Sequence, residues 1–305
     1  MTWKMKAAIQ GVLSAIPGGT SVNYFLQRYV ARTLPESETI FESRVELAKR
    51  HIAVLREKNK VDLKSQKFFE FGAGRDLCGP LTFYCQGVEQ QRLIDLHFIL
   101  RPFLVNDSIR RLQASAARHV LFRVPQLPVR EDKQGCLEDL RRFYGIDFTA
   151  PGDARDTKLP AGSIDAITST NTLEHVPPAD IAQILTELRR ILAPGGIMSF
   201  QVDYQDHWSY FDSAIDVFHF LRYSNQDWSG YNPSLNYQNR LRHVDYLALY
   251  KQAGFQCMEE NCTQEPGDLD RIAALPALGE QFQSYTPEQL SIRKSFVVLK
   301  PAGAA

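Results

Sequence analysis

The segment from Phe68 to Asp76 constrains the fold of this chain more than any other part of it. An apolar run reaches the acidic residue Glu70, and a Gly-x-Gly turn at Gly72 and Gly74 follows almost at once. The next residues, Leu77 to Val88, can form a helix. A buried strand that stops at a glycine turn and leads into a helix is the first unit of a nucleotide-binding α/β sheet. The pattern therefore predicts an α/β fold with a ligand at this turn.

The spacing of the glycines indicates which ligand the turn can hold. A dinucleotide fingerprint places a third glycine three residues after the second, but position 77 is Leu and the next glycine is Gly79. The turn therefore lacks the tight pyrophosphate cradle of a NAD site. Glu70, just before the turn, is placed to hold a cationic amine. Together these features favour S-adenosylmethionine (SAM) as the cofactor over NAD.

Four further motifs follow this turn along the chain: Gly152-Asp153-Ala154, Leu159 to Ile167, Asn171 to Val176 and Glu187 to Gly196. Each is common alone, but their order and separation resemble the class I SAM-dependent methyltransferases from about Lys67 to Tyr204, nearly half of the chain. The resemblance implies an α/β fold: a seven-stranded, mostly parallel Rossmann-like sheet with flanking helices and an antiparallel last strand.

Apolar periodicity and turn residues predict the individual elements. We expect strands at Lys67–Phe71, Arg92–Asp95, Ile146–Thr149, Ile164–Ser169, Ile197–Val202, Gln256–Asn261 and Ser295–Lys300. We expect helices at Leu77–Gln86, Asn106–Ala117, Ala179–Leu192 and Val244–Gln252, with Pro194-Gly195-Gly196 ending the third. We divide the chain into a helical N-terminal extension (1–65) that covers the cleft and a methyltransferase domain (66–305). Val120 to Tyr144 and residues 205–242 exceed a minimal fold, and we interpret 205–242 as a lid over the acceptor.

Composition excludes several function classes. Lys and Arg number 35, as do Asp and Glu, so the formal net charge is zero, which argues against a nucleic-acid partner. The five cysteines form no Cys-x-x-Cys pair, so we expect reduced thiols in a cytoplasmic protein and no metal site. No run is apolar enough to span a bilayer. Residues 3–16 have helical apolar spacing, and we expect this helix to pack on the core, with a peripheral membrane contact as the alternative.

The resemblance and the strand ends assign cofactor contacts. Glu70, Gly72, Ala73 and Gly74 would meet the methionine part of SAM. Asp95 would bind the ribose hydroxyls, although it could instead cap a helix. Asp153, with the backbone of Ala154, would contact adenine, although Asp153 could be a turn residue only. Asn171 would lie near the methionine moiety and the sulfonium.

The segment after the fifth expected strand is the candidate acceptor site. His207 beside Asp206 is the preferred general base, because methyl transfer to a hydroxyl requires removal of its proton. A structural histidine in an aromatic lid is an equal alternative. His175 is a second candidate, or it packs against the core or the cofactor.

Tyr204 begins the same segment and is a candidate acceptor contact. Arg240 and Arg242 could clamp an anionic acceptor or form salt bridges with the lid. We predict methyl transfer to a small polar acceptor, such as a hydroxyl of a sugar or glycan precursor or of a secondary metabolite. The alternatives are RNA or protein as the acceptor, and a catalytically silent SAM-binding scaffold.

Overall fold

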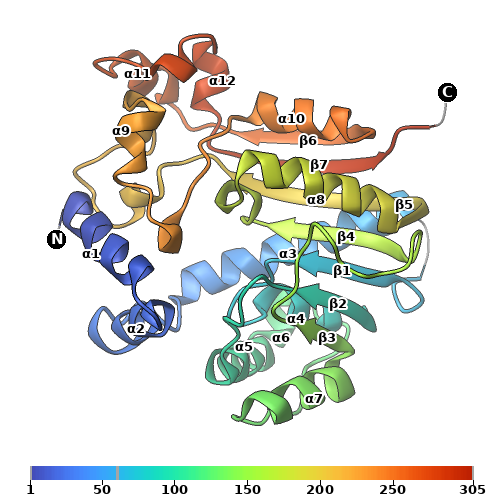
Figure 1. Cartoon of the computed structure of the whole chain (residues 1–305). Helices are drawn as coiled ribbons and strands as arrows, with labels where there is room; N and C mark the ends of the chain where they lie inside the picture. The colour runs from blue at the N-terminus through green and yellow to red at the C-terminus, as the bar shows by residue number, and fades with distance from the viewer. Residues whose placement is uncertain (1, 60–61, 304–305) are drawn as a thin grey trace.

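A seven-stranded sheet with the order β3-β2-β1-β4-β5-β7-β6 organises the chain (Figure 1). The computed structural model describes residues 2–59 and 62–303. The strands are β1 (Lys67–Phe71), β2 (Gln90–Ile94), β3 (Ile146–Thr149), β4 (Ile164–Thr170), β5 (Leu192–Asp203), β6 (Phe255–Thr263) and β7 (Lys294–Pro301). Neighbours from β3 to β5 pair in parallel, and β7 pairs antiparallel with both β5 and β6. The predicted Rossmann-like sheet with an antiparallel last strand is confirmed.

Helices cover both faces of the sheet because alternate side chains of each strand point to opposite faces. Phe69 and Ile167 are fully buried in one apolar cluster with α8 (Pro178–Ile191) and α10 (His243–Gln252). Their chain neighbours Phe68 and Ala166 belong to a second cluster, with α3 (Glu38–Asn59) and α4 (Cys78–Cys85). The central strands are therefore apolar on both faces, as parallel strands between helix layers must be.

Several predicted boundaries shift in the structure. The expected helix Asn106–Ala117 is α5 (Pro102–Ala114) followed by the short α6 (Ala116–His119). The helix α8 ends at Ile191, and the Pro-Gly-Gly turn that we expected to end it lies within the first residues of β5.

The segment Val120 to Tyr144 is not an extra insertion, because its second half is the crossover helix α7 (Lys133–Tyr144). Asp132 caps this helix by accepting a hydrogen bond from the backbone N–H of Gly135 at 2.7 Å. Gly145 ends the helix with a φ of 64°.

Residues 205–242, the expected lid, pack together with a second segment, and we keep the name lid for this assembly. Residues 205–242 form short turns and helices: η3 (His207–Tyr210), η4 (His219–Arg222), α9 (Asn225–Ser229) and η5 (Ser234–Asn236). They share an apolar cluster with the segment between β6 and β7, which contains α11 (Asp268–Ala273), η6 (Glu280–Phe282) and α12 (Pro287–Ser291). Figure 1 shows α1, α9, α11 and α12 gathered at the end of the sheet toward which β4 points.

The N-terminal extension contributes to this lid. It contains α1 (Trp3–Ala15), α2 (Gly19–Phe25), the π-helical turn η1 (Leu26–Val30) and α3. Trp3 is 6% exposed in the lid cluster, with its ring centroid 4.8 Å from that of Tyr231 and 4.9 Å from that of His219. Its backbone N–H donates to Asp212 at 2.8 Å.

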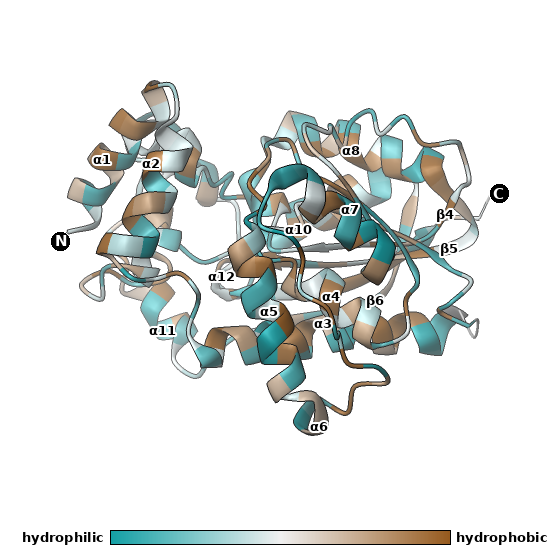
Figure 2. Cartoon of the chain, turned by 90° about the horizontal axis from the view of Figure 1, so that it is seen from below, coloured by the Kyte–Doolittle hydropathy of each residue, from teal (hydrophilic) through white to brown (hydrophobic). Residues whose placement is uncertain are grey.

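The face of α1 that we expected to pack on the core is exposed instead. Its residues Ile9, Val12 and Ile16 are 40%, 65% and 44% exposed. Figure 2 shows apolar residues on α1 and α2 away from the sheet. Among the described residues, no helix has the length and apolar character needed to cross a membrane.

We expect Trp3→Ala to loosen the lid, because truncating a buried tryptophan removes roughly 3–5 kcal/mol of packing free energy. Hydrogen exchange should become faster in α1 and across residues 205–242, while the strands keep their protection. Val12→Ala is the matched control on the exposed side of the same helix and should change nothing. Unchanged exchange in the lid of the Trp3→Ala variant would show that the extension does not support it.

Candidate active site

A cavity of about 170 Å³ opens at the carboxyl ends of β1, β2 and β4. The order of the strands reverses between β1 and β4, where ligands of doubly wound sheets bind. Five of the predicted site residues line this cavity: Gly72, Asp95, Asp153, Ala154 and His175.

The turn after β1 can be formed only by a glycine at position 72. Gly72 has a φ of 71°, and a Cβ there would lie 2.4 Å from the Thr172 Cγ2 atom. Gly74 has a φ of 83°. These conformations bring the backbone of the turn against the loop that follows β4, as the glycine pattern predicted.

The other predicted residues of this turn do not line the cavity. Ala73 is 5% exposed and packs in a core cluster with α4 and α5. Glu70 is 5% exposed, and burial raises its pKa to about 8 although the charge of Arg44 opposes this shift. Arg44, from the N-terminal extension, pairs with both carboxylate oxygens of Asp76 at 2.6 and 2.8 Å. The extension therefore reaches the glycine turn.

Two carboxylates line the cavity, and their partners differ. Asp95 accepts a hydrogen bond from the backbone N–H of His97 at 3.1 Å, and burial raises its pKa. Asp153 instead forms an ion pair with Arg155 at 2.7 Å, which holds the pKa of Asp153 below its ordinary value. The Asp153 carboxylate is therefore already paired with a charged side chain, whereas the hydrogen bond to Asp95 comes from the backbone of the loop that follows β2.

Asn171 directly follows β4, as predicted, but it is not among the residues that line the cavity. It is exposed, has a φ of 50°, and its side-chain oxygen accepts a hydrogen bond from Gln201 at 3.1 Å. The neighbouring Thr172 lines the cavity, and the sequence analysis missed it.

A cluster of Glu174, His175 and His207 borders the cavity. The His175 and His207 ring centroids are 4.9 Å apart. His175 lies in η2 (Leu173–His175), and its Nδ1–H donates to the carbonyl of Tyr237 at 2.7 Å, so its Nε2 carries the free lone pair. Burial lowers the pKa of His207 to about 4, and the neighbouring His175 adds to this shift. Both rings belong to loops that follow adjacent strands.

Glu174 is the buried carboxylate of this cluster. It is 2% exposed, and neither carboxylate oxygen has a hydrogen-bond partner. Burial and the charge of Asp203 raise its pKa well above the ordinary value. The nearby backbone N–H groups of Glu174 and Asp203 oppose this rise in pKa. Glu174 was not among the predicted site residues, although it is adjacent to His175 in the sequence.

Asp206 is not the partner of His207. Its carboxylate accepts hydrogen bonds from the backbone N–H of Trp208 at 2.8 Å and from the ring of His219 at 3.1 Å. Side chains adjacent in sequence diverge in this short helical turn. The predicted Asp206–His207 pair is therefore wrong, and Asp206 supports the lid.

Arg240 and Arg242 are also structural rather than acceptor-binding. Arg240 is 5% exposed and donates to the carbonyls of Phe220 and Tyr223, both at 2.9 Å. Arg242 is fully buried and donates to three carbonyls, those of Tyr204, Leu290 and Ile292, at 2.6–2.7 Å. Neither guanidinium is free to hold an anion, so the predicted clamp is wrong, as is the predicted salt bridge to the lid.

Tyr204 is equally enclosed. It is 2% exposed, and its hydroxyl bonds to Ser295 at 2.6 Å and to His243 at 3.2 Å. The predicted contact of Tyr204 with the acceptor is therefore not supported by its position.

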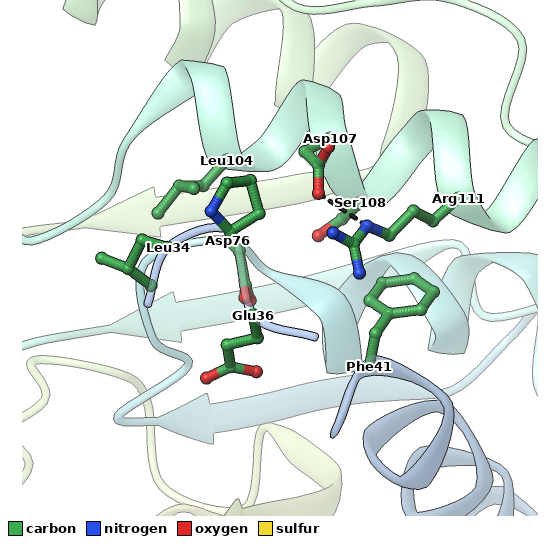
Figure 3. A pocket seen from close by; sticks show the side chains of 9 residues that line it. Leu34, Glu36, Phe41, Asp76, Leu104, Asp107, Ser108 and Arg111 are labelled. Carbon is green, nitrogen blue, oxygen red and sulfur yellow. Dashed lines mark ion pairs between the residues drawn. The ribbon is translucent and has the colours of Figure 1, made fainter. Parts of the chain in front are cut away.

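A second pocket lies between residues 34–41 and α5 (Figure 3). Glu36, Phe41, Leu104 and Asp107 are among its lining residues, and Asp107 pairs with Arg111 at 2.7 Å. Its volume is about 10 Å³, which holds no more than about one water molecule. This crevice is too small for a cofactor or an acceptor.

Comparisons with known proteins agree with the fold. Residues 133–200 match the family model described as a methyltransferase domain. The PH0226 protein from Pyrococcus horikoshii OT3 has a similar structure, with a TM-score of 0.50 and 15% identity, over 92% of this chain and 98% of that chain. Geranyl diphosphate C-methyltransferase from Streptomyces coelicolor A3(2) gives a TM-score of 0.48 and 11% identity, over 88% and 86%. No curated protein matches the chain.

The sheet order, the glycine turn and the cavity define a Rossmann-like nucleotide-binding protein. Together with the methyltransferase-domain match over residues 133–200, they support a SAM-dependent methyltransferase. SAM is its cofactor.

We expect Arg242→Met to destabilise the protein by about 3 kcal/mol or more, because three buried carbonyls lose their donor. Arg242→Lys should also be destabilising, since an ammonium cannot reproduce the planar fork. Chemical denaturation measures both. Arg222→Met in the same lid, at an exposed arginine, should cost less than about 0.5 kcal/mol. If Arg242→Met had an unfolding free energy near that of the wild type, Arg242 would not be structural and would again be a candidate acceptor contact.

Proposed function

We propose that this methyltransferase transfers the methyl group of SAM to a hydroxyl of a small polar molecule, such as a sugar or glycan precursor or a secondary metabolite. The observation that carries the proposal is the cluster of Glu174, His175 and His207 beside the cofactor cavity. A hydroxyl is a weak nucleophile until its proton is removed, and imidazole nitrogens with free lone pairs suit that task. We assign activation of the acceptor to this cluster.

The surroundings of His207 support an acceptor approaching from the lid. Tyr210 stacks on His207 with ring centroids 5.3 Å apart and donates its hydroxyl to Asp203 at 2.5 Å. Tyr210 also lines an open surface hollow of about 400 Å³ with Ser209, Asp216 and other lid residues. Most of the lid tryptophans and phenylalanines are buried in the lid core, so they support the fold of the lid rather than stacking on a sugar. The zero net charge favours a small molecule over nucleic acid.

In this proposal the cavity holds the adenosine part of SAM. Asp95 binds the ribose hydroxyls, and Ala154 with Asp153 borders the adenine. The turn at Gly72 and Gly74, with Glu70 behind it, receives the methionine part, and Asn171 lies near the sulfonium. The N-terminal extension covers the methionine end of the cofactor site through Arg44. A Cβ placed on Gly74 would lie 3.9 Å from the guanidinium of Arg44.

Methyl-deuterated SAM incubated with the protein and a fractionated metabolite extract tests the proposal. We expect a small, oxygen-methylated product in mass spectrometry, formed together with S-adenosylhomocysteine. A labelled RNA or protein, or a product methylated on carbon or nitrogen only, would contradict it.

We expect Asp95→Ala to weaken SAM binding by about 1.5–3 kcal/mol, the range for hydrogen bonds to a charged group. Isothermal titration calorimetry measures this difference. Asp156→Ala, a change at an exposed carboxylate just beyond the cavity loop, is the control and should bind SAM like the wild type. Equal affinities for the two variants would remove Asp95 from the site.

Binding of SAM should release about one proton near pH 7 if Glu70 receives the amine. Glu70 is neutral in the free protein at this pH because its pKa is about 8, and Arg44 is the charged group that faces it. The ammonium of SAM then favours the carboxylate, so the proton leaves and the affinity rises with pH between about 6 and 7, by up to tenfold per unit. Calorimetry in buffers of different ionisation enthalpy counts the proton. Glu70→Gln should release none, and release from that variant would exclude Glu70 as its source.

A further inference from the structure

Two of the three residues in the acceptor cluster, Glu174 and His207, have buried polar atoms without partners, whereas His175 is exposed. Glu174 is 2% exposed and His207 is 9% exposed, and both oxygens of Glu174 and the Nε2 atom of His207 have no hydrogen-bond partner. Buried polar groups in folded proteins are nearly always satisfied by protein, water or an ion. Three such atoms in one place, beside a cofactor cavity, point to a ligand that they share.

The donor atoms of the cluster converge. One ligand atom from each of Glu174, His175 and His207 lies within 4.8 Å of the others. Ligand bonds of about 2.0–2.2 Å require separations of roughly 3.0–3.5 Å between donor atoms, which small side-chain rotations can reach. The ligands come from two loops that follow the adjacent strands β4 and β5, so the sheet itself sets their spacing.

The surroundings of the cluster orient it as a metal site requires. The Nδ1–H of His175 donates to the Tyr237 carbonyl at 2.7 Å, which directs its Nε2 lone pair into the cluster. Metal-binding histidines commonly have such a contact on their second nitrogen. Asp203 is not a fourth ligand, because its carboxylate is held by Tyr210 at 2.5 Å and by Gln205 at 3.0 Å.

We propose that Glu174, His175 and His207 bind one divalent transition-metal ion, of the Zn²⁺ class, at the acceptor end of the SAM cavity. Two imidazoles and one carboxylate form a ligand set that suits Zn²⁺ and leaves a coordination position open for substrate. The sequence predicts no metal site, because its cysteines form no Cys-x-x-Cys pair and these histidines lie in separate loops.

This inference rests on the proposed function and specifies how the cluster activates the acceptor: the imidazole lone pairs bind the ion, and the ion rather than an imidazole promotes loss of the acceptor proton. The acceptor hydroxyl binds the open position of the ion, which lowers its pKa, and its proton leaves to water. The resulting oxygen anion forms a bond to the methyl carbon of SAM. The bond between that carbon and sulfur breaks, its electron pair stays on sulfur, and S-adenosylhomocysteine is the leaving group.

A second group of possible ligands provides the control. His243, Glu260 and Cys262 also lie within 4.8 Å of one another. Both ring nitrogens of His243 are already occupied, by Glu260 at 2.9 Å and by the hydroxyl of Tyr204 at 3.2 Å. Cys262 is exposed, so Cys262→Ser removes the second group without disturbing the cavity.

The test is titration of the chelator-treated full chain with Co²⁺ and with Zn²⁺, followed by visible absorption and by calorimetry. We expect one ion per chain, and an affinity at least about 100-fold lower for Glu174→Gln and for His207→Gln. Cys262→Ser should bind like the wild type. Melting temperature and SAM binding report whether each variant is folded, and Glu174→Gln should fold because its carboxyl has no hydrogen-bond partner to lose.

Each outcome has a defined meaning. The inference is overturned if the wild-type protein binds neither Co²⁺ nor Zn²⁺. It is also overturned if Cys262→Ser loses metal binding while both Glu174→Gln and His207→Gln keep it. Methyl transfer that is undiminished after chelation overturns the role of the ion. Wild-type protein that binds SAM but neither metal contradicts the metal site alone, whereas failure to bind SAM contradicts the proposed function itself.

Discussion

The parallel pairing of β1 with β4 is the constraint on which the rest of the site depends. Phe68 pairs with Ala166, Phe69 with Ile167 and Glu70 with Thr168, so the two strands end side by side. The chain must therefore leave both strands at one place, and the Gly72 turn meets Thr172 there at a distance that excludes a Cβ. The same register brings η2, with Glu174 and His175, to the wall of the cofactor cavity.

The acceptor side of the site depends on a second structure, built around that sheet end. His207 follows β5 and is held by the lid, whose core joins α1, residues 205–242 and the segment before β7. Arg242, within residues 205–242, joins these parts, since its guanidinium donates to the carbonyl of Tyr204 and to those of Leu290 and Ile292 in the segment before β7. The buried arginine stabilises the lid by satisfying backbone groups that no secondary structure covers. Orientation of His207 is thus linked to contacts far from the cavity.

Local signals predicted the sheet, and contacts between distant segments explain what the sequence missed. The Gly72 turn and the central strands could be predicted from the sequence because each depends only on residues that are close together in the chain. The helix α7 was not predicted, although Asp132, Gly145 and the apolar spacing of Cys136, Leu140 and Tyr144 are local signals for it. The contacts that build the lid could not be predicted in this way: Trp3 packs on residues more than two hundred positions away. Sequence adjacency likewise suggested the pair of Asp206 with His207, whereas the fold pairs Asp206 with His219.

A crystal structure of the protein with S-adenosylhomocysteine would test the central claim most directly. We expect the adenosine in the cavity of Gly72, Asp95 and Ala154, with both ribose hydroxyls on the Asp95 carboxylate. The sulfur should face His175 and His207, leaving room between them for a methyl group and an oxygen. Product bound elsewhere, or bound with its sulfur turned away from this cluster, would contradict the assignment of both the cofactor cavity and the acceptor site.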